Sequence, residues 1–304
     1  MLLFLILAIL LILLGFIVSI LTGAKDISMQ IVIKSILSKE QGLDFEIIRN
    51  SRLPRVIAAF FVGGFLSISG AILQGITRNP LAEPSIMGIS QGATLFIAIF
   101  NFFNFYGIFN NYIAAFIGSI LTGILIFIFT INSIRVGNIA KFLLAGIALS
   151  TFYISLATIL AILSNKSQEL AFWVSGGFRN VTWQSLNPLL FIGIICFLFS
   201  ILLASKINIL NLGDEVAIGL GQSPLKIRFK AIIIVILLCT ISVSIAGNIA
   251  FVGLIVPYIV TKMFSNDYRI IMPISFTFGG LLLIWADILA KTISKPYEMP
   301  IGLF

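Results

Sequence analysis

Two acidic side chains lie where chemistry inside a membrane would need them. Asp287 stands in the apolar run LLLIWADILAK, and Glu83 follows Arg78 in the stretch RNPLAEPSIMGISQGA. Acids inside membrane spans often mark ion or proton sites, and both residues would then be coupling carboxylates of an ion-driven secondary transporter. Asp287 also lies four residues before Lys291, a spacing that permits a helical ion pair, and we favour that structural role. For Glu83, pairing with Arg78 and a gate formed by this turn both remain open.

Enzymatic chemistry finds little support in the sequence. The chain has no histidine, and its two cysteines, Cys196 and Cys239, both lie inside apolar runs. A Ser-His-Asp triad therefore cannot be built, and a zinc site or a disulfide framework is not indicated. The phosphate-binding pattern GxxxxGK[ST] is absent, so this chain should not bind ATP by a P-loop. We expect a protein that is not an enzyme and that carries no metal or other cofactor.

The composition places the chain in a membrane. Of its 304 residues, 60% are hydrophobic and 10% charged, and its mean hydropathy is +1.16. One soluble core could not hide so much apolar surface, and a helical span needs about 20 apolar residues. The apolar runs predict an all-α, polytopic transmembrane bundle, treated as a single domain over 1–304. Its nine expected spans are 2–22, 56–76, 85–103, 112–131, 139–163, 186–204, 229–246, 249–264 and 270–289.

The basic residues set the expected orientation. The net charge is +8, but the cations are scattered between apolar runs, which argues for positive-inside flanks and against nucleic-acid binding. An N-terminus inside puts nine Lys or Arg on cytoplasmic segments against four outside, once the long outer loop 23–55 is set aside. That loop holds the amphipathic stretch ISMQIVIKSIL, which suits a membrane surface. The inner segment 206–230 is the other substantial polar stretch.

The second span carries a face of small residues. Gly63, Ser67 and Gly70 recur along RLPRVIAAFFVGGFLSISGAILQG, and such faces let helices approach closely. Tight packing is the simpler interpretation. The functional alternative is that this face borders a translocation path, with Ser67 and Gln74 in its polar lining.

Cations gather at the outer ends of two spans. Arg52 and Arg55 bracket Pro54 before the second span, and Lys291 and Lys295 end the ninth. Snorkelling anchors are the default explanation for such residues. An outward cluster of cations would equally receive carboxylates from a soluble partner, because complementary charge sets docking register.

Together, several segments resemble the FecCD family of membrane subunits of bacterial ABC importers for iron siderophores, haem and cobalamin. The resemblance runs nearly the whole length and rests on nine strings in the family's order. These are RLPR from Arg52, SGAILQG from Ser69, NPLAEPSIMGISQGA from Asn79, LAGIALS from Leu144, WVSGG from Trp173, LNLGDEVAIGLG from Leu210, GNIAFVGLIVPYIV from Gly247, WADILAK from Trp285 and EMPIG from Glu298.

The resemblance implies partners and roles. It implies a homodimer, or a heterodimer with a related permease, two cytoplasmic ABC ATPase subunits and an extracytoplasmic substrate-binding protein, in the cytoplasmic membrane of a bacterium. Docking of the binding protein would fall to Arg52, Arg55 and Lys291. An inner gate would fall to Asn79 and Leu81. Coupling to the ATPase would fall to Gly213, Asp214, Glu215, Gly219 and Gly221.

The chain departs from the family pattern at two places. Tyr258 and Lys262 stand where relatives usually carry histidine and arginine. The family continues after EMPIG into a tenth span, whereas this sequence stops at Phe304, and we expect a truncation. An iron siderophore is the expected cargo, with haem or cobalamin as alternatives. An ion-coupled secondary transporter is the competing class.

Overall fold

A computed structural model describes residues 2–23, 27–37, 42–105, 108–135, 139–295 and 297–304. Every regular element in these ranges is a helix. The apolar helices are α1 (Leu2–Leu21), α4 (Leu53–Thr77), α5 (Ile89–Phe102), α6 (Ile108–Arg135), α7 (Ile139–Leu163), α9 (Trp183–Asn211), α11 (Pro224–Ala246), α12 (Val252–Met263) and α13 (Tyr268–Thr292). One helix matches each predicted span, so the prediction of a polytopic helical bundle is confirmed.

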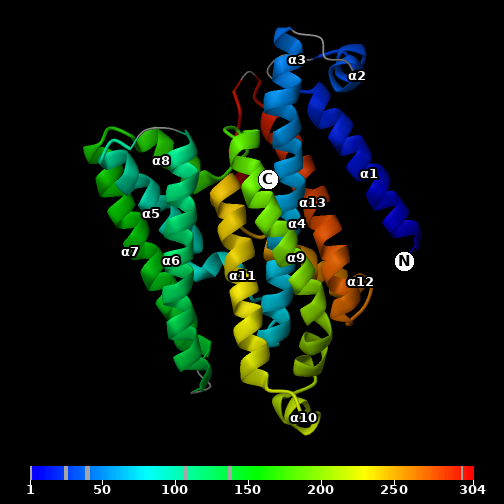
Figure 1. Cartoon of the computed structure of the whole chain (residues 1–304), viewed down its shortest axis with the longest axis vertical. Coiled ribbons are helices and arrows are strands. Elements are labelled where there is room, and N and C mark those ends of the chain that lie inside the picture. The colour runs from blue at the N-terminus through cyan, green and yellow to red at the C-terminus, as the bar shows by residue number, and fades with distance from the viewer. Residues whose placement is uncertain (1, 24–26, 38–41, 106–107, 136–138, 296) are drawn as a thin grey trace.

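The short helices mark the two ends of the bundle. In Figure 1, α2 (Met29–Leu37) and α3 (Leu43–Ile47) lie at one end and α10 (Asp214–Gly219) lies at the other. Following the predicted orientation, we call the α10 end inner and the opposite end outer. Helix α8 (Ser167–Ser175) connects α7 to α9 at the outer end and was not expected from hydropathy, because it is only nine residues long.

The predicted outer loop 23–55 is more helical than expected. Besides α2, the chain is helical without a break over Leu43–Thr77, because α3 passes through a π-helical turn at Ile48–Arg52 into α4. The second span therefore projects beyond the membrane on its outer side. Residues 24–26 and 38–41 of the predicted loop lie outside the described part of the chain.

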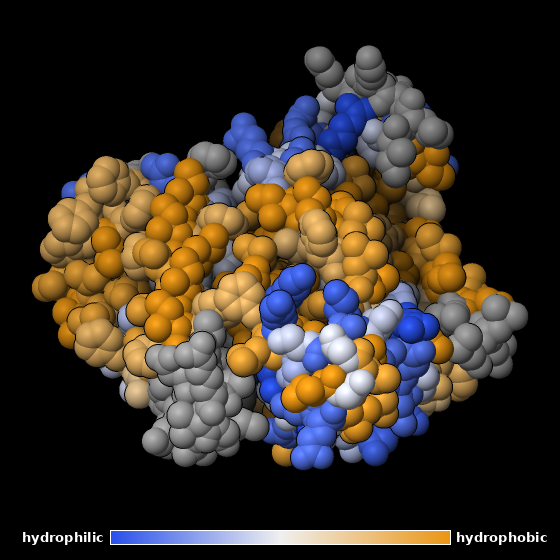
Figure 2. Space-filling model, turned by 60° about the horizontal axis from the view of Figure 1, so that its bottom comes forward, coloured by the Kyte–Doolittle hydropathy of each residue, from blue (hydrophilic) through white to orange (hydrophobic). Residues whose placement is uncertain are grey.

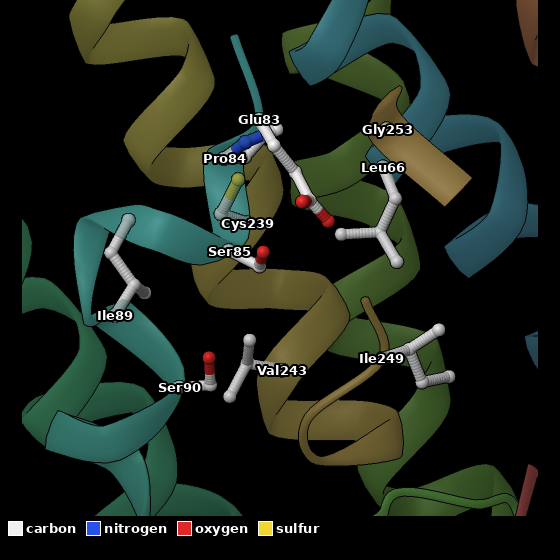
Figure 3. Close-up of a pocket in the computed structure, with 10 residues that line it drawn as sticks. All are labelled: Leu66, Glu83, Pro84, Ser85, Ile89, Ser90, Cys239, Val243, Ile249 and Gly253. Carbon is white, nitrogen blue, oxygen red and sulfur yellow. The ribbon is translucent and has the colours of Figure 1, made fainter. Parts of the chain in front are cut away.

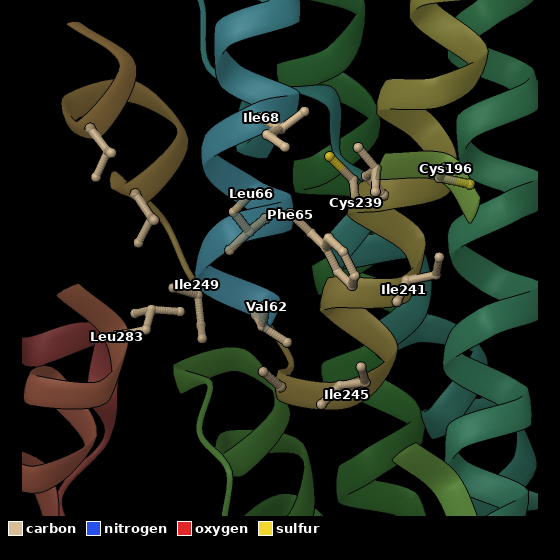
Figure 4. Close-up of a cluster of buried hydrophobic side chains, with 14 of the residues drawn as sticks. Val62, Phe65, Leu66, Ile68, Cys196, Cys239, Ile241, Ile245, Ile249 and Leu283 are labelled. Carbon is tan, nitrogen blue, oxygen red and sulfur yellow. The ribbon is translucent and has the colours of Figure 1, made fainter. Parts of the chain in front are cut away.

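Helix α4 is the centre of the bundle. It packs against α9, α11, α12 and α13, and most of its side chains are buried. Glycines make these contacts close: a methyl group on Gly63 would overlap the backbone of Gly279 on α13, and one on Gly70 would overlap the carbonyl group of Gly253 on α12. Around this axis lies a continuous apolar core that includes Phe65, Leu66 and Ile68 of α4 (Figure 4). Small residues thus bring the neighbours of α4 into backbone contact, as expected for helices in a membrane.

Helices α5 and α12 span only part of the bundle. Helix α5 follows a 3₁₀ turn at Pro84–Met87, and α12 follows an irregular stretch after α11 in which Phe251 has a φ of 67°. Non-helical backbone at membrane depth is tolerated only where protein covers it. Here α4 and α11 flank these irregular segments.

Candidate functional site

The outer end holds a charge network, by which we mean Arg55, Asp287, Lys291 and Glu298. The guanidinium of Arg55 donates to both oxygens of Asp287 at 2.9–3.1 Å and to Glu298 at 2.8 Å. Lys291 Nζ lies 3.3 Å from Asp287, so the predicted helical ion pair is confirmed. The Asp287 side chain is only 1% exposed, and a buried carboxylate needs such partners to stay charged. The network ties α4 to α13 and to the segment after α13.

Two of the predicted docking residues face inward. Arg52 donates to the carbonyl groups of Ile20 and Leu21, the latter at 2.9 Å, and thereby satisfies the C-terminal end of α1. Lys291 donates to the backbone and hydroxyl oxygens of Ser19 on the same helix. Both side chains are buried in this structure. Their geometry is that of anchors for α1, and of the three predicted docking cations Arg55 is the most exposed.

The inner end holds a second group of charges, the inner clamp, formed by Arg78, Asp214 and Arg228. Asp214 on α10 accepts two hydrogen bonds from Arg228 at 2.8 and 2.9 Å and is also paired with Arg78. Partial burial raises the pKa of Asp214, but the bonds and charge of Arg228, followed by those of Arg78, outweigh this and hold the pKa below its usual value. Arg78 also donates to Leu210 O at 3.0 Å, at the end of α9. The clamp therefore fastens α10 to α4, α9 and α11.

Helix α10 presents apolar side chains to the outside at the inner tip. Exposed residues here are Leu212, Val216, Ile218, Leu220 and Leu225, which we call the inner apolar patch. Figure 2, which looks toward this end, shows hydrophilic residues around the tip with apolar surface among them. Of the predicted coupling residues, Gly219 has open space around it, and Gly221 has a φ of +71°, which disfavours any larger residue. Glu215 is exposed on the same helix.

The predicted gate residues form a turn next to the clamp. The side-chain oxygen of Asn79 accepts the backbone N–H of Leu81 at 3.0 Å, the usual Asx-turn geometry. Leu81 is 69% exposed. This turn connects α4 to the half-length helix α5 at the inner end.

Glu83 does not pair with Arg78, contrary to one of the two interpretations of the sequence. Its carboxylate accepts the backbone N–H of Phe251 at 2.6 Å, at the N-terminus of α12. The positive end of the helix dipole stabilises a carboxylate there, and Arg78 has Asp214 instead. A cavity of about 20 Å³, enough for one water molecule, lies beside it between the ends of α5 and α12 (Figure 3).

The predicted lining residues of the second span are packed inside the chain. Ser67 is fully buried against Gly279, and Gln74 donates to Leu254 O at 3.1 Å on α12. Both side chains are buried, and α12 and α13 pack against α4 here. The geometry supports the packing interpretation of the small-residue face.

The fold defines a polytopic helical membrane protein, with no group of metal-ligating side chains among the described residues. Residues 10–304 match the FecCD transport family, and the chain belongs to it. It is therefore a multi-pass protein of the bacterial cytoplasmic membrane.

Two curated relatives show the range of this family. The chain is 38% identical to the iron(3+)-hydroxamate import system permease protein FhuB of Bacillus subtilis (strain 168), over 95% of this chain and 76% of that protein. It is 34% identical to the hemin transport system permease protein HmuU of Yersinia pestis, over 84% of this chain and 78% of that protein.

One solved structure is similar over nearly the whole chain. It is an inward-facing conformation of a metal-chelate type ABC transporter, with a TM-score of 0.84 and 26% identity, and it covers 97% of this chain and 92% of that chain. The resemblance inferred from the nine sequence strings is thereby confirmed.

Proposed function

We propose that this chain is the permease subunit of an ABC importer that carries a ferric siderophore across the cytoplasmic membrane. Relatives named for iron-hydroxamate and iron-citrate import support this cargo, while the haemin permease keeps haem as the alternative. The chain supplies the path and no chemistry. Two ATPase subunits, an extracytoplasmic binding protein and a second permease chain complete the importer.

The observation that carries the proposal is the inner apolar patch together with the clamp behind it. Apolar side chains that stand outside the membrane need a protein partner to cover them. The clamp joins the patch to α4 through Arg78 and to α11 through Arg228, so a displacement of α10 by a partner reaches the centre of the bundle. This arrangement suits a contact through which an ATPase drives the permease.

At the outer end, Arg55 is the best-placed docking cation. It is 12% exposed, and its partner Glu298 is 32% exposed. A carboxylate of the binding protein that reaches Arg55 would compete with Glu298 and leave the bond to Asp287 in place. Arg52 and Lys291 act in this proposal by holding α1 against the network, and Asn79 and Leu81 act as the inner gate.

The structure gives less support to an ion-coupled transporter. That class would use Asp287 and Glu83 as coupling carboxylates. Asp287 is already neutralised by Arg55 and Lys291, and Glu83 is engaged by the α12 N-terminus. Neither acid is free to take up and release an ion in this conformation.

The test is uptake of radiolabelled ferric siderophores, haem and cobalamin into cells with and without the gene, in the presence of its partner subunits. Gly219→Trp should abolish uptake while the protein stays in the membrane, because a Cβ at this position has open space among the described residues and the bulky ring would stand in the way of a partner. Gly219→Ala is the matched control and should transport normally. Normal uptake by Gly219→Trp, or uptake that follows the ion gradient and ignores loss of the ATPase, would overturn the proposal.

A further inference from the structure

An apolar groove runs between α9 and α11 on the inner half of the bundle. It has a volume of about 430 Å³, and its walls are formed by residues that include Phe199, Leu202 and Ile233. Leu202 is 73% exposed, so the groove opens outward and away from the α4 core. Nothing in the function proposed above uses this surface.

The length of the groove along α9 matches the thickness of one leaflet of a bilayer. On α9 its lining runs from Cys196 to Lys206, ten residues later. At about 1.5 Å per residue this is about 15 Å. That length equals half of a hydrocarbon core of about 30 Å. One acyl chain of the inner leaflet would therefore lie along the groove.

Two lysines stand at the inner mouth of the groove. Lys206 of α9 and Lys230 of α11 both line it and are exposed. Among the described residues the side chain of neither lysine makes an ion pair or a hydrogen bond, and no acidic side chain lines the groove. An unneutralised pair of cations at the edge of the inner leaflet attracts an anionic headgroup.

The lining argues against a protein helix as the occupant. Helices pack together in membranes through small residues, as α4 does through Gly63 and Gly70. Among the described residues that line the groove there is no glycine, alanine, serine or threonine. Its large apolar side chains suit an acyl chain, which needs no backbone contact.

We propose that this groove binds one anionic phospholipid of the inner leaflet, with its phosphate between Lys206 and Lys230 and an acyl chain against Leu202 and Ile233. The lipid would brace α9 against α11, the two helices that the inner segment with α10 connects. The proposal does not depend on the cargo of the permease.

The test is native mass spectrometry of the full chain purified with its partner subunits and given equal amounts of phosphatidylglycerol and phosphatidylcholine. The wild type should retain phosphatidylglycerol preferentially. The double variant Lys206→Gln/Lys230→Gln should retain less of it, by roughly fivefold for each lysine removed. Lys206→Arg/Lys230→Arg should restore retention, because it restores the charge.

Lys262→Gln is the matched control. Lys262 is also an exposed cation of the inner end, but it lies on α12 over the ring of Tyr258 and outside the groove. Its removal should leave retention unchanged. The proposal would be overturned if the double variant retained as much phosphatidylglycerol as the wild type, or if the control lost as much as the double variant. It would also be overturned if phosphatidylcholine bound equally well, if a second protein chain occupied the groove in place of the lipid, or if soluble glycerol phosphate displaced the lipid.

Discussion

The outer charge network and the inner clamp each contain an aspartate paired with two basic side chains, but in different surroundings. Asp287 in the outer network is 1% exposed, whereas Asp214 in the inner clamp is 41% exposed. Buried charges must keep their partners, since each lost partner leaves an uncompensated ion in a medium of low polarity. Half-exposed charges exchange partners with water and with other proteins at small cost. The comparison indicates that the outer network stabilises the packing of the helices, whereas the ion pairs of the inner clamp can be exchanged for contacts with a partner.

The largest effect should come from the centre of the outer network. Asp287→Ala removes the carboxylate that Arg55 and Lys291 share and leaves two cations close together in a largely buried site. We expect a loss of about 3–5 kcal/mol in the free energy of unfolding, measured in detergent. Glu215→Ala, at an exposed acid of α10, is the control and should change little. Equal effects of the two substitutions would contradict the contrast between the two ends.

A smaller loss is expected when the charge at Arg55 is kept but its shape is changed. Arg55→Lys cannot reach both Asp287 and Glu298 with several donors, because an ammonium group lacks the planar fork of a guanidinium. The loss of one charge-assisted bond corresponds to about 1.5–3 kcal/mol. Thermal unfolding of the purified protein measures the effect. Glu298→Gln tests the more exposed bond, from Arg55 to Glu298, separately. It should lower the stability less than Arg55→Lys does.

The inner clamp should matter more for transport than for stability. Asp214→Ala frees Arg78 and Arg228, which are partly exposed and can be solvated. We expect the free energy of unfolding to fall by roughly 1 kcal/mol or less. Uptake should fall sharply, because α10 loses its attachment to α4 and α11. A variant that is strongly unfolded, or that transports normally, would show that the clamp has another role.

The smallest expected effect is a pH dependence at the inner end. The pKa of Asp214 is lowered in the folded protein, so the stability it contributes is fully present above the ordinary aspartate range and is lost as the pH falls through the lowered pKa. The difference in stability between the wild type and Asp214→Asn should be constant near neutral pH and disappear in acid. A difference that grows toward acid pH would contradict the lowered pKa.

Much of the fold was predictable, because hydropathy is a local property of the chain. Each apolar run became one helix, and the family strings pointed to the same architecture. Helix α8 and the π-helical extension at Ile48–Arg52 were missed, because they are short and carry no long apolar run. The family strings WVSGG and RLPR overlap these two segments, but they do not predict a helical conformation.

The partners of the charged and polar residues could not be predicted from the local sequence. The sequence singled out Arg55 and Asp287, but 232 positions separate them along the chain and no local pattern predicted that they pair. Glu83 was close enough to Arg78 for a pair, yet its partner lies on α12. Ser67 lies on a small-residue face that suited either packing or a path, and only the structure shows that α13 approaches it at Gly279.

The sequence by itself determined that the protein is a helical membrane permease of the FecCD family, and which residues are too polar for lipid. Only the tertiary structure decided which partner each of these residues has, and hence which charges hold the bundle and which remain available. The reason is physical: insertion into a membrane depends on the polarity of each segment alone. An ion pair between distant segments exists only after close packing of α4, α12 and α13 has brought their backbones together.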